Sequence, residues 1–201
     1  MIKNKSTRII AAVAVSTAVI SGASIAETGN GTASVEVKNS FDVAQTTPLS
    51  FGQIVAIASD LTGGADKATL TVNSDGSTAD VIADDGGLAS IVAITAGTAG
   101  TFTVTGAAPN TVLTIGAISA FKLTDPSGTD SKEFDVTNLT TSVVTSGSPF
   151  TYDTDATGTL VFNVGATLET DTTGTVASGS QAAQPYENVT FTGTYTVDVN
   201  Y

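Results

Sequence analysis

Apolar and polar residues alternate along much of this chain, and the longest such run closes it. From residue 189 to residue 201, apolar side chains recur at every second position, and threonine, aspartate or asparagine lies between them. The apolar members are Val189, Phe191, Tyr195, Val197, Val199 and Tyr201, with Gly193 interrupting the series. A period of two sustained over 13 residues is typical of a β-strand and not of a helix. The pattern predicts a long C-terminal strand with one buried face.

A second alternating run lies near the N-terminus, within residues 27–45. One face carries Val35, Val37, Asn39, Phe41 and Val43, and the positions between them are polar. This pattern predicts a strand over residues 33–43 with one buried face. Alternation does not identify the partner of that strand. The strand either completes the sheet of its own subunit or fills a groove in a neighbouring copy.

Shorter β-branched runs follow at intervals of about ten residues, separated by turn sequences such as Asp75-Gly76. These runs are residues 49–51, 69–72, 91–94, 101–105, 111–115, 118–123, 134–136 and 159–164. Residues 52–61 are the one segment with a helical alternative. We therefore predict an all-β protein: an immunoglobulin-like or pilin-like sandwich of two sheets and about nine or ten strands, in a single domain over residues 27–201.

The first 26 residues have the pattern of a secretory signal peptide. Lys3, Lys5 and Arg8 precede an apolar stretch over residues 9–20, and small residues end the segment at Ala26. We expect cleavage after Ala26 and export of the remaining chain. No later apolar run reaches spanning length, so no transmembrane segment is predicted in the mature chain.

The amino-acid composition limits the kinds of partner and of reaction that the protein can have. The exported part would carry 4 basic and 19 acidic residues, a net charge of −15, which argues against a nucleic-acid partner. The chain has no Cys and no His, which excludes disulfides, thiol nucleophiles, histidine-dependent triads and the common zinc sites. The aspartates lie mostly in turn sequences. We predict no catalytic, cofactor-binding or metal-binding residue, although calcium binding by these turns stays open.

Four segments carry a resemblance to a known family. They are PLSFG at 48–52, TFTVTG at 101–106, LVFNVG at 160–165 and GTYTVDVNY at 193–201. Their order resembles the bacterial secreted family known as domain of unknown function 4402, which looks similar to the spore coat protein U type of archaic chaperone–usher pilin. The resemblance covers nearly the whole predicted mature chain and rests on strand patterns.

The resemblance implies a sandwich that crosses the periplasm of a Gram-negative bacterium and stays on, or is released from, the cell surface. Copies of itself or related pilin-like subunits are the expected partners, with a periplasmic chaperone and an usher as further ones. The C-terminal residues Val197, Val199 and Tyr201 look similar to the ending that such pilins present to a chaperone. Together with Phe191 and Tyr195, they are the candidate assembly or core residues of the last strand. An ordinary core strand has the same pattern, so both interpretations stay open.

We therefore expect a structural or interaction protein and not an enzyme. It would be a pilin-like subunit of a cell-surface filament or coat, assembled by β-strand addition with residues 27–45 as the donor strand. The alternative is a monomeric secreted binding module, an adhesin or a carbohydrate-binding domain, which would hold residues 27–45 in its own sheet.

Overall fold

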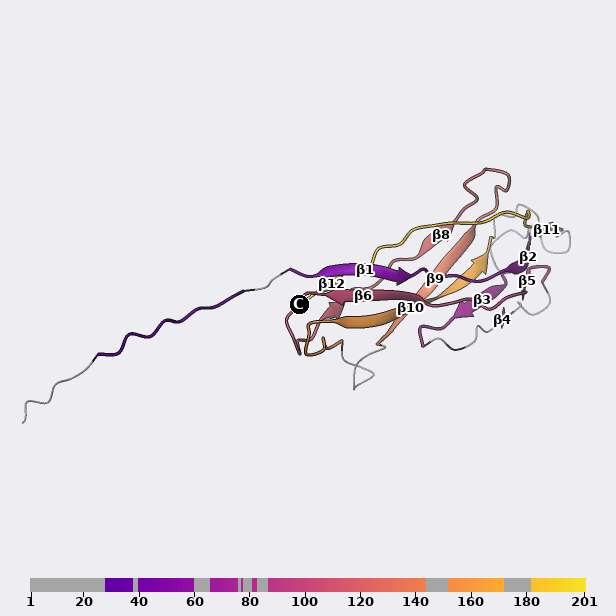
Figure 1. Cartoon of the computed structure of the whole chain (residues 1–201). Coiled ribbons are helices and arrows are strands. Elements are labelled where there is room, and N and C mark those ends of the chain that lie inside the picture. Colours follow the sequence, from indigo (N-terminus) through magenta and orange to yellow (C-terminus); the bar gives the residue numbers. More distant parts are fainter. Residues whose placement is uncertain are drawn as a thin grey trace, which may run out of the picture. The chain divides into compact units, whose positions relative to one another are not determined.

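The computed structural model describes residues 28–37, 40–59, 66–75, 77, 81–82, 87–143, 152–171 and 182–201. The predicted signal peptide and Asn39 lie outside these residues. The chain divides into two units, residues 1–36 and 37–201, and the second holds every described strand (Figure 1). In the first unit, residues 28–36 form no strand and are exposed.

The described residues form strands and no helix, which confirms the predicted all-β, sandwich-like fold. In chain order the strands are β1 (Asp42–Thr47), β2 (Ile54–Ser59), β3 (Thr69–Val72), β4 (Val81–Ile82), β5 (Ser90–Ala93), β6 (Gly100–Thr105), β7 (Thr114–Ile115), β8 (Phe121–Leu123), β9 (Phe134–Val143), β10 (Leu160–Thr170), β11 (Ala183–Pro185) and β12 (Val199–Asn200). They make a seven-stranded sheet, a three-stranded sheet (β11-β2-β5) and a two-stranded sheet (β12-β7), all antiparallel.

Strand β10 organises the seven-stranded sheet. One edge pairs with β9, which in turn pairs with β8. The other edge pairs first with β6, from Leu160 to Val164, and then with β3, from Ala166 to Glu169. Gly165 lies where the partner changes, and a Cβ there would come within 2.4 Å of the carbonyl oxygen of Val72. Glycine is therefore the residue that lets β3 approach the centre of β10.

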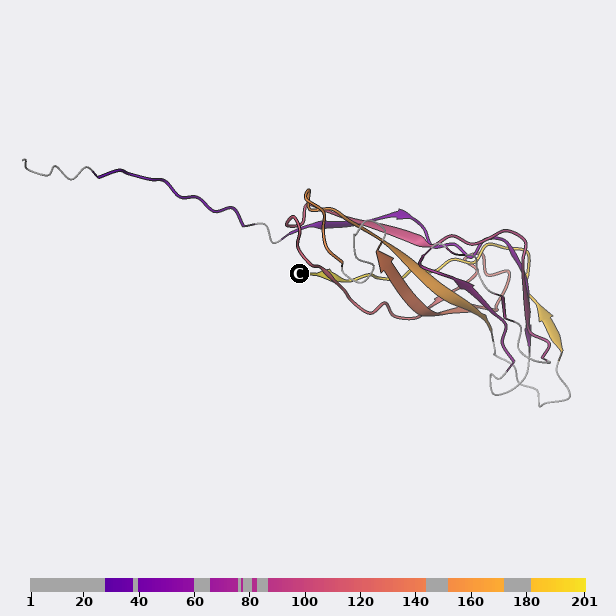
Figure 2. The same ribbon diagram turned by 90° about the horizontal axis from the view of Figure 1, so that it is seen from below.

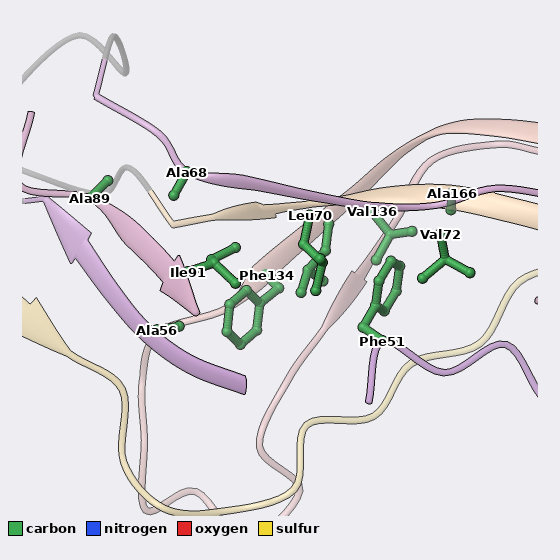
Figure 3. Close-up of a cluster of buried hydrophobic side chains, with 11 residues drawn as sticks. Phe51, Ala56, Ala68, Leu70, Val72, Ala89, Ile91, Phe134, Val136 and Ala166 are labelled. Carbon is green, nitrogen blue, oxygen red and sulfur yellow. The ribbon is translucent and has the colours of Figure 1, made fainter. Parts of the chain in front are cut away.

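Two apolar clusters lie against the seven-stranded sheet. Cluster 1 lies between β3, β9 and the second half of β10 on one side and β2 and β5 on the other (Figure 3). Its buried members are Phe51, Ala56, Ala68, Leu70, Val72, Ala89, Ile91, Phe134, Val136, Ala166 and Leu168. Cluster 2 lies against β6 and the first half of β10, and consists of Phe102, Val104, Ala107, Leu113, Leu160, Phe162 and Val164.

The helical alternative for residues 52–61 is wrong. Residues Ile54–Ser59 form β2, which pairs with β5 on one edge and β11 on the other. Ala56 and Ala58 are buried whereas Val55 is exposed, which is the period of two that a strand requires. Together with β4 and β11, this strand brings the described total to 12, in three hydrogen-bonded sheets rather than the two expected.

Both long terminal strands were predicted with the wrong bounds. Residues 33–37 form no strand, and pairing begins at Asp42, where β1 joins β6. Of residues 189–201, only Val199 and Asn200 lie in a ladder, with an isolated bridge at Thr192. The predicted face is nevertheless correct, because Phe191, Tyr195, Val197 and Val199 are half-buried and the threonines between them are exposed.

Candidate functional site

An open groove of about 640 Å³ lies over cluster 1. One wall is the segment that joins β1 to β2, residues 49–54, and the other is residues 188–195 of the C-terminal segment. Apolar side chains line the space between them: Phe51, Phe121, Leu123, Phe134, Leu168 and Phe191. Figures 1 and 2 show the C-terminal segment, in yellow, following the length of the domain towards the end from which β1 starts.

The first wall is fixed from behind. Ser50 forms a two-hydrogen-bond bridge with Thr98, with N···O distances of 2.9 and 2.7 Å. Gly52 has φ of +77°, and a Cβ at this position would lie 2.3 Å from the carbonyl oxygen of Thr95. Glycine is therefore required for the wall to approach the 95–98 segment so closely. Phe51, between these two anchors, points into cluster 1 (Figure 3).

The second wall is anchored in the same way. Thr192 forms a bridge with Thr124 at the end of β8, with both N···O distances at 2.9 Å. Gly193 follows, and a Cβ there would lie 2.2 Å from the carbonyl oxygen of Lys122. The ring of Phe191 packs edge-on against Phe134, with centroids 5.1 Å apart. Each wall is thus held by one bridge on the side away from the groove.

The opposite backbone edge of each wall faces the groove. In an extended chain, N–H and C=O groups of successive residues point to opposite edges. Because Ser50 and Thr192 bond away from the groove, the backbone groups of Leu49, Phe51, Phe191 and Gly193 point towards it. Within the described part of the chain, these groups make no backbone hydrogen bond. The groove therefore has a free hydrogen-bonding edge on both sides.

The two walls run antiparallel. Gln45 in β1 donates a hydrogen bond from Nε2 to the Tyr195 hydroxyl at 3.3 Å, and further along Phe41 packs edge-on against Tyr201 with centroids 5.2 Å apart. Residue numbers thus rise along one wall as they fall along the other. We call the end near Tyr195 the Tyr195 end. The other end, where Ile54 and Ile94 line the groove, is the Ile94 end.

Tyr195 closes the first of these ends. Its ring stacks on Phe121 at a centroid distance of 5.1 Å and meets Phe102 of cluster 2 edge-on at 6.0 Å. Burial raises the pKa of Tyr195, while the hydrogen bond from Gln45 acts in the opposite direction. The hydroxyl therefore stays protonated at neutral pH and links the second wall to β1 without introducing charge.

The predicted N-terminal residues fall into two groups. Val35 and Val37 belong to no strand, and 85% and 70% of their surfaces are exposed. Phe41 packs on Tyr201, and Val43 pairs with Val104 inside β1, so both belong to the subunit's own sandwich. Asn39 lies outside the described residues. The predicted donor face is therefore divided at the start of β1.

The predicted C-terminal residues are also divided. Phe191 and Tyr195 line the groove, whereas Val197 and Val199 pack against cluster 2. Tyr201 accepts a hydrogen bond from the backbone N–H of Ala108 at 3.1 Å. Sequence reasoning did not identify residues 49–54 as the first wall. The motif PLSFG marked that segment, but its role depends on what lies opposite it in the fold.

In two of the described aspartate turns, at Asp125 and Asp155, the carboxylate accepts hydrogen bonds from the protein itself. Asp125 accepts backbone N–H bonds from Ser127, Thr129 and Asp130 at 2.7–2.9 Å. The bond from Asp130, then the Ser127 hydroxyl, lowers the pKa of Asp125 to about 2. Asp155 has a similar turn with Thr157 and Thr159. Among the described residues, no group of three or more acidic side chains is placed to hold a metal ion.

A family model described as a domain of unknown function (DUF4402) matches residues 41–201, so the chain belongs to that family. This confirms the family resemblance seen in the sequence, while the likeness to chaperone–usher pilins stays a prediction. No curated protein and no solved structure matches the chain. The part of the chain that the structure describes has no helix long and apolar enough to cross a membrane.

Proposed function

We propose that this member of a family of unknown function is a structural subunit of a filament or coat at the bacterial cell surface. Residues 28–37 of one copy fill the groove of the next copy as an added strand. The observation that carries the proposal is the groove itself, with an apolar floor and an unpaired backbone edge on each wall. A strand placed there bonds to both walls, as in other cases of β-strand addition.

The donor segment is long enough for the groove. The second wall bends at residues 188–189, and the six residues that follow, 190–195, span about 20 Å when extended. The exposed N-terminal segment, residues 28–37, has ten residues and spans about 33 Å when extended. One such segment therefore reaches from one end of the groove to the other.

The side chains of the donor agree with the groove as well. Ala33, Val35 and Val37 share one face of an extended chain, and Ser34 and Glu36 lie on the other. The apolar face meets the aromatic floor, and the polar face stays in water. Burying the two valines contributes on the order of 3–6 kcal/mol before the entropy lost on ordering the segment. The added main-chain hydrogen bonds fix direction and register.

Export fits this proposal. An open aromatic groove and an exposed apolar segment in one chain favour premature association. A periplasmic chaperone that occupies the groove until an usher exchanges it for a donor segment removes that hazard. The signal-peptide pattern over residues 1–26 supports the export step.

The test compares two forms of the protein by size-exclusion chromatography with light scattering. The form with residues 27–201 is expected to give multiples of the subunit mass. The form with residues 41–201 is expected to be a monomer that binds a synthetic peptide of residues 27–40. The matched control is the same peptide with Val35→Asp and Val37→Asp, which keeps length and polar face but loses the apolar plugs and binds at least tenfold more weakly.

A stable monomer of residues 27–201, together with no binding of the peptide by residues 41–201, contradicts the proposal. The monomeric binding module then becomes the better description. Its ligand would be sought by screening extended peptides and oligosaccharides against the same groove.

A further inference from the structure

A second apolar surface lies outside the groove. Nine large apolar side chains are exposed among the described residues: Val35, Val37, Val43, Val55, Leu88, Val92, Ile94, Val112 and Tyr201. Two of them, Val35 and Val37, belong to the donor segment. Four others come from β2, β5 and the residues next to β5, so exposed apolar surface is concentrated on this sheet. Single exposed aliphatic residues are ordinary, but a contiguous group marks an interaction surface.

Strand register places two of these residues on one face. Val55 and Val92 are direct cross-strand partners, and Ile57 and Ser90 form the next pair on the same face. Leu88 and Ile94 lie just beyond the two ends of β5 and are exposed as well. The opposite face carries Ala56 and Ile91, which are buried in cluster 1 (Figure 3). We call the outer face with Val55 and Val92, together with Leu88 and Ile94 beyond the ends of β5, the β2–β5 face.

The β2–β5 face is continuous with the groove at one end. Ile94 lines the groove and is also exposed on this face, and its backbone N–H bonds to the carbonyl oxygen of Gln53 at 2.7 Å. Gln53 is a residue of the first wall. A molecule that leaves the groove at the Ile94 end therefore passes directly beside Val92 and Val55.

The tether between donor segment and subunit body is short. Four residues, 38–41, separate Val37 from the first residue of β1. They span about 14 Å at most. The body of a donating copy must therefore lie against whichever end of the groove receives Val37.

The two possible ends give different assemblies. Each copy's own N-terminal segment joins its body at Phe41, beyond the Tyr195 end. If Val37 were received at that same end, two copies would exchange segments and close into a pair, leaving the β2–β5 face in water. If Val37 is received at the Ile94 end, giving and receiving take place at opposite ends, and the contact repeats without closing.

We infer that the β2–β5 face is the second half of the subunit contact. The body of the donating copy docks on Val55, Val92 and Ile94 when its Val37 occupies the Ile94 end of the groove. This inference rests on the proposed function. With Val37 received at the Ile94 end, the subunits join head to tail in an open chain. Each junction then combines an added strand with an aliphatic contact between the two bodies.

Engineered cysteines test the direction, since the chain has none of its own. Val37→Cys is combined either with Gln53→Cys, at the Ile94 end, or with Gln45→Cys, at the Tyr195 end. Gln53 is exposed on the first wall, and Gln45 is exposed on β1, the strand that leads into this wall. Under mild oxidation, the Gln53 pair is expected to give a ladder of disulfide-linked multimers on non-reducing gels, and the Gln45 pair little product. Preferential linkage through Gln45→Cys, ending at a dimer, overturns the inference.

A matched pair of charge substitutions tests the face. Val92→Glu places a carboxylate on the β2–β5 face. Val112→Glu is the control, at a valine with the same exposure, 59%, which bridges to Asp153 and precedes Leu113 of cluster 2. We expect Val92→Glu to reduce assembly of residues 27–201 at least tenfold, while Val112→Glu assembles normally. In residues 41–201, both variants bind the peptide of residues 27–40 as the unsubstituted domain does.

The readouts separate the two claims. Normal peptide binding with normal assembly of Val92→Glu refutes the β2–β5 contact and leaves strand addition intact. Absence of peptide binding by the unsubstituted domain refutes the proposed function, and the further inference fails with it.

Discussion

Clusters 1 and 2 lie against the same sheet but are covered differently. In cluster 2, the C-terminal segment ends in a ladder, with Val199 paired to Ile115, and Val104, Leu160 and Phe162 are completely buried. Over cluster 1, the same segment is held by one bridge at Thr192 and leaves a groove beside Phe51 and Phe134. Continuous alternation in sequence thus produces a closed core at one end and an open core at the other.

Alternation in sequence therefore specifies burial of a face and not completion of a sheet. Val199 pairs with β7 of the same chain, and Val197 packs against cluster 2 beside it. Phe191 has an apolar floor below it and β8 behind it, but within the described residues nothing bonds to its backbone on the groove side. Under the proposed function, the described part of the chain leaves the place of one strand beside Phe191 for another copy to fill.

The largest loss of stability should come from a cavity made in cluster 2. Phe162→Ala removes a fully buried ring that stacks on Phe102 and should lower the free energy of unfolding by about 3–5 kcal/mol. Phe191→Ala, on the groove wall, should lower it by only about 1–2 kcal/mol, because that ring is half-buried and not completely buried. Urea unfolding of residues 41–201 measures both values.

Peptide binding reverses the order of these two variants. Phe191→Ala should lose most of the stabilisation that the peptide of residues 27–40 gives, whereas Phe162→Ala, at a temperature where it is folded, should keep it. Equal stability losses for the two variants would mean that the second wall is as tightly packed as cluster 2. That result would contradict the difference between the two clusters.

Much of the fold could be predicted from the sequence. Residues 69–72 were assigned as β3 correctly, and β5, β6, β8 and β9 were found near their true positions, because β-branched residues alternate there between turn sequences. The second half of β9 was missed. Its sequence is rich in threonine, and a bulge near Asn138, with φ of +49°, interrupts the register opposite Ala166.

The candidate site could be predicted only in part. Phe191 and Tyr195 were found because period-two alternation identifies their buried face. The sequence does not show which segment lies beside that face. Residues 49–54 and 188–195 are remote in sequence and come together only through the seven-stranded sheet. The division between Val37 and Phe41 likewise follows from pairing of β1 with β6, and no local pattern marks it.

An intermediate effect is expected from the glycine that shapes the first wall. Gly52→Ala combines a left-handed backbone with a Cβ 2.3 Å from the Thr95 oxygen, and should lower the free energy of unfolding by about 2–4 kcal/mol. Gly106→Ala is the matched control. It has φ of +79° but open space around a Cβ, and should lose only about 1–2 kcal/mol.

The same pair of variants tests whether the wall must be held in place. Gly52→Ala should also weaken peptide binding, because the wall has to move away from residues 95–98, whereas Gly106→Ala should bind as the unsubstituted domain does. Full peptide affinity in Gly52→Ala would show that the groove tolerates displacement of its first wall. Titration calorimetry with residues 41–201 provides the measurement.

The smallest expected effect is a dependence on pH that acts on the open cluster alone. Asp125 follows Thr124, the bridge partner of the second wall, and its carboxylate organises the turn over residues 125–130. Its pKa of about 2 in the folded protein lies below the value of about 3.9 for an unfolded chain. A depressed pKa stabilises the fold fully above about pH 4, and this contribution disappears as the pH falls towards 2.

Asp125→Asn should therefore remove part of the acid sensitivity of peptide binding between pH 4 and pH 2. The peptide used carries Glu27→Gln and Glu36→Gln and an amidated C-terminus, so that it has no carboxyl that titrates in this range. Asp155→Asn is the control, since Asp155 organises a similar turn beside Ala107 of cluster 2. Its pH dependence of binding should match the unsubstituted domain. If Asp125→Asn and Asp155→Asn change the pH dependence of binding equally, the turn at Asp125 does not act through the second wall. Acid would then affect both clusters in the same way.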